Sequence, residues 1–208
     1  MIGGIHIKRI LTALLIISLL GATGCSTEKV KATTKRHSNT AQKLQQVQPA
    51  KQVQAGNLQY YFTKANQYPD EQLINVINSS KSTLDIAIYS LTKKSIVNAI
   101  IQAKDRKVNV RIMTDKIESK SKSESKELAL LQKDNIPIKI NSHPGLLHIK
   151  MTIADKNIAT TGSYNYTENA STKNDEILVI INDSKVAEGF DSEFENMWND
   201  TKDYEDIN

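Results

Sequence analysis

The chain has 208 residues, of which 39% are hydrophobic and 24% are charged, and this length accommodates one globular domain of about 150 residues with extensions. Cys25 is the only cysteine, which excludes an intrachain disulfide, and the four histidines lack the spacing of a zinc site, so we expect no dedicated metal site. The net charge of +4 is unevenly spread: residues 1–57 carry eight Lys or Arg and one acid, whereas residues 183–208 carry nine acids and two lysines. The basic balance is therefore largely a property of the N-terminal tail and does not by itself indicate a nucleic-acid-binding domain.

Residues 1–25 have the pattern of an export signal. Two basic residues precede an apolar run over residues 11–20 that is too short to span a membrane comfortably. The run ends in small residues before Cys25, which resembles the lipobox of bacterial lipoproteins, although Ala22 stands where that motif usually has leucine. We therefore expect Cys25 to be lipidated. The alternatives are an ordinary signal peptide cleaved near Gly24 and an uncleaved anchor.

Residues 26–57 are rich in Lys, Gln, Thr, Ser and Asn and have little to bury, which is typical of a disordered tether. The basic residues can also lie against anionic lipid, but a solvated spacer is the simpler interpretation. We expect the domain at residues 58–208 to be exported and held by Cys25 at the outer face of the bacterial cytoplasmic membrane, or to be secreted.

From residue 58 onward the apolar periodicity becomes regular. In chain order it predicts a strand at 58–63, a helix from 69, a strand at 82–89, a helix at 94–107, a strand at 108–114, a charged, mobile loop at 115–126, a helix at 127–133 and a strand at 136–140. A loop at 141–145, strands at 147–153, 158–161 and 175–181, and a closing helix follow, and we expect the acidic C-terminus to fray. The closing helix is expected to bury Val186, Phe190, Phe194, Met197 and Trp198. This order predicts an α/β domain in which a mixed sheet is flanked by helices on both faces.

The residues suited to chemistry gather between His148 and Asn165. Apolar and polar residues alternate over 147–153, which predicts that His148 and Lys150 project from one face of a strand, roughly 6.5–7 Å apart. An imidazole can act as a nucleophile or as a general acid or base. The neighbouring ammonium repels cations and stabilises charge on the oxygens of an anionic substrate, so the pair favours anion chemistry over metal binding.

The same stretch holds residues that can support such a site. Gly162 permits a close backbone approach, and Ser163 and Asn165 supply donors for the oxygens of a bound anion. Glu176 begins the next predicted strand and is a candidate to accept the second N–H of His148, which would fix the tautomer of the ring.

The spacing of these residues resembles a known signature. The pattern His148-x-Lys150-x-x-x-x-Asp155, followed after six residues by Gly162-Ser163-x-Asn165, is similar to the HxKxxxxDxxxxxxGSxN motif of the phospholipase D superfamily. The likeness covers about residues 58–204 and includes Tyr89-Ser90-Leu91-Thr92, Asn165-Tyr166-Thr167, Asn174, Glu176 and Trp198. It is greatest to the small bacterial endonucleases of that superfamily, which carry one motif per chain.

The resemblance implies a phosphodiester substrate, no metal requirement and no cofactor. It implies that one histidine attacks phosphorus to form a phosphohistidine while a second histidine protonates the leaving oxygen and then activates water. Only one motif occurs here, so the resemblance implies a homodimer with a shared site. Lys150, Ser163 and Asn165 are then the phosphate-binding residues, Asp155 acts more in positioning than in chemistry, and Glu176 holds His148.

Three functions remain open from the sequence. The first is a nonspecific nuclease acting on DNA or RNA, which the single motif and the length favour. The second is a phospholipase acting on glycerophospholipids, which the expected membrane placement favours. The third is a non-catalytic lipoprotein that binds nucleic acid at the cell surface.

Overall fold

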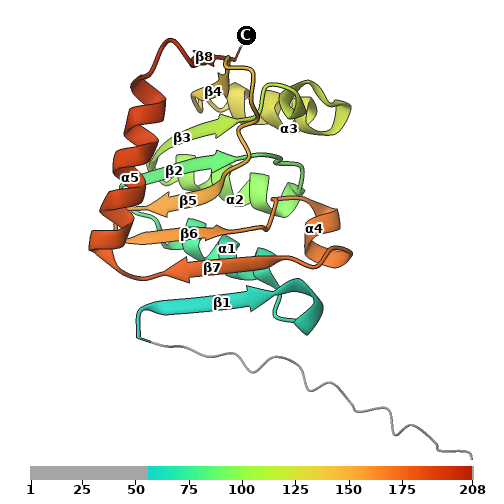
Figure 1. The fold of residues 1–208 in the computed structure, drawn as a ribbon, viewed down its shortest axis with the longest axis vertical. Coiled ribbons are helices and arrows are strands. Elements are labelled where there is room, and N and C mark those ends of the chain that lie inside the picture. Colours follow the sequence, from blue (N-terminus) through green and yellow to red (C-terminus); the bar gives the residue numbers. More distant parts are fainter. Residues whose placement is uncertain (1–55, 208) are drawn as a thin grey trace, which may run out of the picture. The chain divides into compact units, whose positions relative to one another are not determined.

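The computed structural model describes residues 56–207, and these form one eight-stranded mixed sheet with helices on both of its faces (Figure 1). The predicted export signal, Cys25 and nearly all of the predicted tether lie outside the described residues. The strands are β1 (Leu58–Phe62), β2 (Thr83–Ile88), β3 (Asn109–Thr114), β4 (Ile138–Asn141), β5 (Lys150–Ala154), β6 (Ile158–Gly162), β7 (Ile177–Ile181) and β8 (Tyr204–Asp206). Their spatial order is β1-β7-β6-β5-β2-β3-β4-β8, with β2, β3 and β4 parallel and every other pairing antiparallel. The predicted fold class is confirmed.

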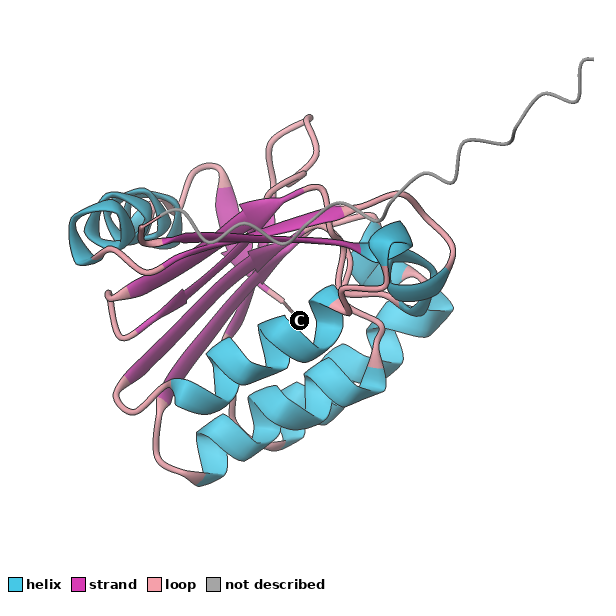
Figure 2. Ribbon diagram, turned by 90° about the horizontal axis from the view of Figure 1, so that it is seen from below, coloured by secondary structure: helices cyan, strands magenta, loops and turns pink. Residues whose placement is uncertain are grey.

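Five α-helices are joined to this sheet in the described part of the chain. They are α1 (Pro69–Ser79), α2 (Lys94–Asp105), α3 (Lys122–Lys133), α4 (Glu168–Thr172) and α5 (Ser184–Asn199), and short 3-10 turns lie at Thr63–Ala65 and Glu118–Lys120. Helix α5 lies against one face of the sheet, while α1, α2 and α3 cover the other (Figure 2). Since β2 lies in the middle, its alternating side chains enter two different cores, with Ile86 facing one and Ala87 the other.

The two cores differ in size. The larger core lies between the sheet and α1, α2 and α3 and contains fully buried aliphatic side chains such as Leu73, Ile100 and Ile112. The smaller core lies under α5 and contains Phe194 and Met197 together with apolar residues of the chain around β5. Val186 was predicted to be buried in α5, but it is 39% exposed.

The segment 115–126 was predicted to be a charged, mobile loop, and this prediction is wrong. It contains the turn at Glu118–Lys120 and the first residues of α3, which begins at Lys122. The Ser121 hydroxyl caps this helix by accepting the N–H of Glu124, at the spacing of a capping box. The side chains of Asp115 and Glu124 are fully buried, so two of the charges that suggested a solvated loop point inward instead.

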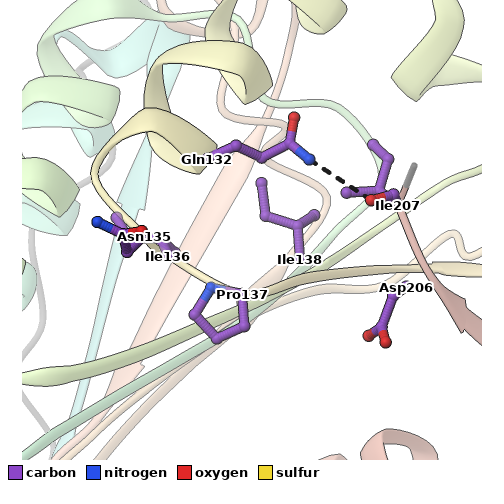
Figure 3. Close-up of a pocket in the computed structure, with 7 residues that line it drawn as sticks. All are labelled: Gln132, Asn135, Ile136, Pro137, Ile138, Asp206 and Ile207. Carbon is purple, nitrogen blue, oxygen red and sulfur yellow. Dashed lines mark hydrogen bonds between the residues drawn. The ribbon is translucent and has the colours of Figure 1, made fainter.

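The acidic C-terminus was expected to fray, but it forms β8, which pairs antiparallel with β4. Gln132 of α3 donates to the carbonyl of Ile207 at 3.5 Å, across a surface hollow that Figure 3 shows. The Lys116 ammonium also forms an ion pair with Glu205 at 3.2 Å. Backbone pairing and these two side-chain contacts hold the end of the chain against the sheet edge.

Candidate active site

The antiparallel pairing of β5, β6 and β7 brings most of the predicted site residues together at one end of the sheet. The start of β5, the end of β6 and the start of β7 are adjacent there, because neighbouring antiparallel strands place opposite chain ends side by side. A hollow of about 410 Å³ opens at this end, and we call it the His148 hollow. It is lined by His148, Lys150, Gly162, Ser163, Asn165 and Glu176. Five of the six residues predicted to form the site therefore share it, together with Gly162.

His148 and Lys150 lie on one side of this hollow. Strand β5 begins at Lys150, so His148 lies in the extended segment just before the strand rather than within it. His148 is exposed, whereas Lys150 is 7% exposed and its ammonium donates to the carbonyl of His148 at 3.0 Å. The apolar residues that alternate with them, including Met151 and Ile153, pack into the core under α5, as the pattern predicted.

The environment of Lys150 lowers its pKa. Burial disfavours the charged form and brings the pKa below its ordinary value of 10.5, while the negative charge of Glu176 opposes this effect. The ammonium nitrogen lies 4.9 Å from the centroid of the Tyr89 ring. A partly dehydrated cation of this kind interacts strongly with an anion that enters the hollow.

Ser163 and Glu176 form the opposite side of the hollow. The Ser163 hydroxyl donates to Glu176 at 2.5 Å, and the amide of Asn174 donates to the other carboxylate oxygen at 3.1 Å. Both oxygens of Glu176 are therefore engaged by neighbours, and neither accepts a hydrogen bond from His148 in this chain. Within one chain the carboxylate of Glu176 thus orients Ser163, and its role in holding His148 stays a prediction.

Gly162 is needed where β6 approaches β7. Its φ of +139° is rarely adopted by residues with a side chain, and a Cβ at this position would collide with the carbonyl oxygen of Ile177. The next residue depends on this approach, because the N–H of Ser163 donates to the same carbonyl at 3.1 Å. Gly162 thereby places Ser163 beside Glu176.

Asn165 presents a side chain with unused hydrogen-bonding capacity. Its Oδ1 is buried and has no hydrogen-bond partner among the described residues. Burying a polar atom without a partner is costly, so the amide is suited to a ligand that enters the hollow. An asparagine can turn its NH₂ or its oxygen toward such a ligand.

Asp155 lies outside the His148 hollow, at the opposite end of β5 from Lys150. Its carboxylate accepts the backbone N–H groups of Lys81, Ser82 and Thr83 at 2.7–2.9 Å. Partial burial raises the pKa of Asp155, but the three backbone hydrogen bonds together outweigh it, so the pKa lies below its ordinary value. The residue itself has a φ of +52°, so it turns the chain between β5 and β6 while it binds the start of β2. Its position fits a structural role.

Two residues near the hollow were not predicted to belong to the site. The ring of Tyr89 lies against both His148 and Lys150, and its hydroxyl donates to Glu118 at 3.3 Å. The buried carboxylate of Asp115 accepts the N–H of Leu147 at 2.9 Å and so fixes the residue before His148. Each follows directly after a parallel strand of the sheet, which is where such sheets place functional groups. Their positions directly after predicted strands could therefore have indicated that Tyr89 and Asp115 lie near the site.

Within residues 56–207, no three His, Cys, Asp or Glu side chains converge as a set that could hold a metal ion. No helix in that same part of the chain is long and apolar enough to cross a membrane.

Comparison with known proteins shows which family the chain belongs to. Residues 73–198, more than half of the chain, match the family described as cardiolipin synthase, PLD-like domain. The chain therefore belongs to this phospholipase D-like family. Among curated proteins it is similar to a phospholipase D of Rickettsia conorii, at 34% identity over 57% of this chain and 58% of that protein. It is also similar to the human mitochondrial cardiolipin hydrolase, at 29% identity over 61% of this chain and 50% of that protein. The chain thus spans little more than half the length of these relatives.

Solved structures share the fold. Nuc of Salmonella typhimurium, a phospholipase D family member, superposes with a TM-score of 0.67 at 28% identity, covering 72% of this chain and 97% of that one. NucT of Helicobacter pylori superposes with a TM-score of 0.62 at 24% identity, covering 68% of this chain and 96% of that one. The likeness to Nuc and NucT extends over nearly their entire length, in contrast to the curated relatives.

Proposed function

We propose that this protein is a phosphodiesterase that works without a metal ion and cuts nucleic acid without sequence specificity. The observation that carries the proposal is the set of groups in the His148 hollow: an exposed imidazole, a partly dehydrated ammonium and the amide of Asn165, whose Oδ1 has no hydrogen-bond partner among the described residues. An ammonium at this place supplies the positive charge that the non-bridging oxygens of a phosphodiester need.

In the proposed mechanism, His148 attacks phosphorus and the bond to the leaving oxygen breaks. The product is a phosphohistidine and a leaving group that has taken a proton from a second acid. Water then attacks the phosphohistidine, which releases the phosphomonoester and regenerates the imidazole. Lys150, Ser163 and Asn165 hold the phosphate through both steps, while Asp155 and Glu176 keep their neighbours in place.

The second acid is proposed to be His148 of a second copy of the chain. One chain supplies a single imidazole to the hollow, and that imidazole is exposed, as a shared site on a two-fold axis requires. Sedimentation combined with activity tests this part. A dimer whose activity falls with dissociation supports it, and a fully active monomer would contradict it.

Nucleic acid is the preferred substrate class because the single motif and the length of the chain resemble the small bacterial endonucleases of the superfamily. In agreement with a small single-domain enzyme, the fold likeness covers nearly the entire length of Nuc, whereas the relatives named phospholipase D are matched over little more than half of theirs. A phospholipid substrate is the second candidate, favoured by the sequence identity to those same relatives. We further propose, from the sequence pattern, that the domain is exported and anchored through lipidated Cys25. Loss of membrane fractionation in Cys25→Ala tests this placement.

The decisive assay incubates the full chain, in chelator, with plasmid DNA, with RNA, or with phosphatidylcholine vesicles into which the chain has been reconstituted and the detergent removed. Plasmid nicking that is lost in His148→Ala supports the nuclease, and release of choline or phosphatidic acid supports the phospholipase. DNA retention without cleavage, unchanged in His148→Ala, would overturn both and favour a binding lipoprotein.

A further inference from the structure

A second hollow opens beside the His148 hollow and shares Ser163 and Glu176 with it. It has a volume of about 200 Å³, and we call it the flanking hollow. Its remaining lining residues are Phe62, Lys64, Asp175 and Ile177. A group bound to a phosphate in the His148 hollow can therefore extend across Ser163 and Glu176 into this neighbouring space.

The sheet builds the flanking hollow from strand ends. Phe62 ends β1 and lies opposite Ile177 at the start of β7, while Gly162 at the end of β6 lies opposite Leu178. The N–H of Thr63 donates to the carbonyl of Glu176 at 3.1 Å, which joins the segment after β1 to the segment before β7. Because backbone hydrogen bonds fix these ends, the hollow exists before any ligand arrives.

The lining offers three kinds of contact. Phe62 and Ile177 are only partly buried and present apolar surface, and Phe62 also contacts Tyr60 edge-on at 5.6 Å. Lys64 is exposed and carries a positive charge, and Asp175 is an exposed carboxylate that can accept N–H groups. A flat ring with polar N–H groups at its edge, followed by an anion, matches this combination.

We propose that the flanking hollow binds the nucleoside next to the scissile phosphate, with its base against Phe62 and the following phosphate at Lys64. This rests on the proposed function of the His148 hollow. Bases stack on aromatic side chains whatever their sequence, which suits a nonspecific enzyme. The hollow is smaller than the roughly 300–1,000 Å³ of sites that enclose a drug-sized ligand, so it takes one ring-sized group. The lining holds two carboxylates, Asp175 and Glu176, against Lys64, so a cationic lipid headgroup is the competing occupant that the experiment below must distinguish.

The test compares two single-stranded oligonucleotides of equal length, one with normal bases and one with abasic sites throughout. The full-length wild type is expected to cleave the normal strand with about tenfold higher kcat/KM, the size of one stacking contact. Phe62→Leu keeps an apolar side chain but removes the aromatic face, and it is expected to abolish this preference while cleaving the abasic strand as the wild type does. A misfolded variant would instead lose both activities, so the abasic strand is the internal control.

Lys64→Gln tests the contribution of the positive charge independently of the aromatic ring of Phe62. It is expected to lower kcat/KM for both strands several-fold. It should also reduce the slope of log(kcat/KM) against the logarithm of the salt concentration by about one, since one phosphate contact is lost. Lys133→Gln, an exposed lysine in α3, is the matched control and should leave both values unchanged.

The outcomes distinguish this inference from the proposed function. If the wild type cleaves neither oligonucleotide, the proposed nuclease itself fails. If it cleaves both equally and Phe62→Leu behaves like the wild type, the nuclease stands and the flanking hollow does not bind the base. If Phe62→Leu loses hydrolysis of phosphatidylcholine vesicles but not of DNA, the hollow takes a lipid headgroup and the nucleoside assignment is overturned.

Discussion

The aromatic ring of Tyr89 lies 4.7 Å from the imidazole of His148, centroid to centroid, with 56° between the two planes. The ammonium of Lys150 lies 4.9 Å from the centroid of the same ring. One side chain therefore contacts the proposed nucleophile and the proposed phosphate-binding cation together. Its hydroxyl is held by Glu118, and burial together with that carboxylate raises the pKa of Tyr89 above its ordinary value of 10.0, so the phenol stays neutral.

Tyr89→Leu is expected to lower kcat by about tenfold or more with a smaller change in KM. The substitution removes the aromatic ring that contacts both the His148 imidazole and the Lys150 ammonium and so helps to position them. Removing the ring also exposes Lys150 to water, so its pKa rises toward 10.5. Because the charged ammonium is the form that binds phosphate, we expect the pH at which activity falls through deprotonation of Lys150 to move upward. Tyr89→Phe keeps the ring and is expected to stay within a few-fold of the wild type. Equal losses in both variants, with no movement of the pH profile, would contradict this role.

Asp155 is predicted to stabilise the fold rather than to take part in catalysis. Asp155→Ala removes the acceptor of three backbone N–H groups and should lower the free energy of unfolding by about 1–3 kcal/mol at neutral pH, while kcat of the folded fraction changes little. The folded-state pKa of Asp155 is lowered, so its contribution is complete above pH 3.8 and is lost as the pH falls through the folded-state pKa. Denaturant titrations of both proteins should therefore converge in acid. A large loss of kcat with unchanged stability would show that Asp155 acts in the reaction.

Gly162→Ala is expected to disrupt the end of β6. The added Cβ meets the carbonyl of Ile177, and alanine is strained at a φ of +139°. The expected result is a clearly lower Tm together with loss of activity, because Ser163 loses its position beside Glu176. Gly189→Ala in α5 is the control, since a Cβ there meets no atom within 4 Å and alanine favours helix. Unchanged stability and activity in Gly162→Ala would contradict the close approach described for this strand end.

Glu124 gives the fold a predictable pH dependence. Burial raises its pKa from 4.5 to about 7, against the hydrogen bond from Thr114, and its Oε2 is buried without a partner. Since the folded state binds the proton more tightly than the unfolded state, the free energy of unfolding should fall as the pH rises from 4.5 to 7, by at most about 3 kcal/mol. Glu124→Gln should remove that fall. The measurement is urea unfolding of both proteins between pH 4.5 and 8, and parallel curves would refute the assignment.

Most of the sheet and helices could be predicted from the sequence, because apolar alternation and helical periodicity report which faces are buried. The site residues between His148 and Asn165 could be predicted for a similar reason, since they lie close together in the chain and their spacing is distinctive. The segment 115–126 was misjudged because its charges suggested solvent exposure. A polar sequence does not reveal that Glu124 turns inward to accept a bond from Thr114.

Contacts between segments that lie far apart in the chain could not be predicted from the sequence either. The hydrogen bonds that Ser163 and Asn174 donate to Glu176 in the folded chain were not predicted from the sequence. Tyr89 reaches the site only because β2 and β5 pair, with Ile88 opposite Lys150, and this register is not readable from either strand alone. The flanking hollow depends in the same way on the pairing of β1 with β7.

The central claim is that His148 forms a covalent bond to phosphorus, and the stereochemical course of the reaction tests it most directly. A phosphorothioate diester of one configuration would be cleaved by the full chain in ¹⁸O-labelled water and the configuration of the product determined. Two successive in-line displacements, the first by His148 and the second by water, each invert phosphorus, so the account predicts overall retention. Overall inversion would mean that water attacks the diester directly, and it would contradict the phosphohistidine.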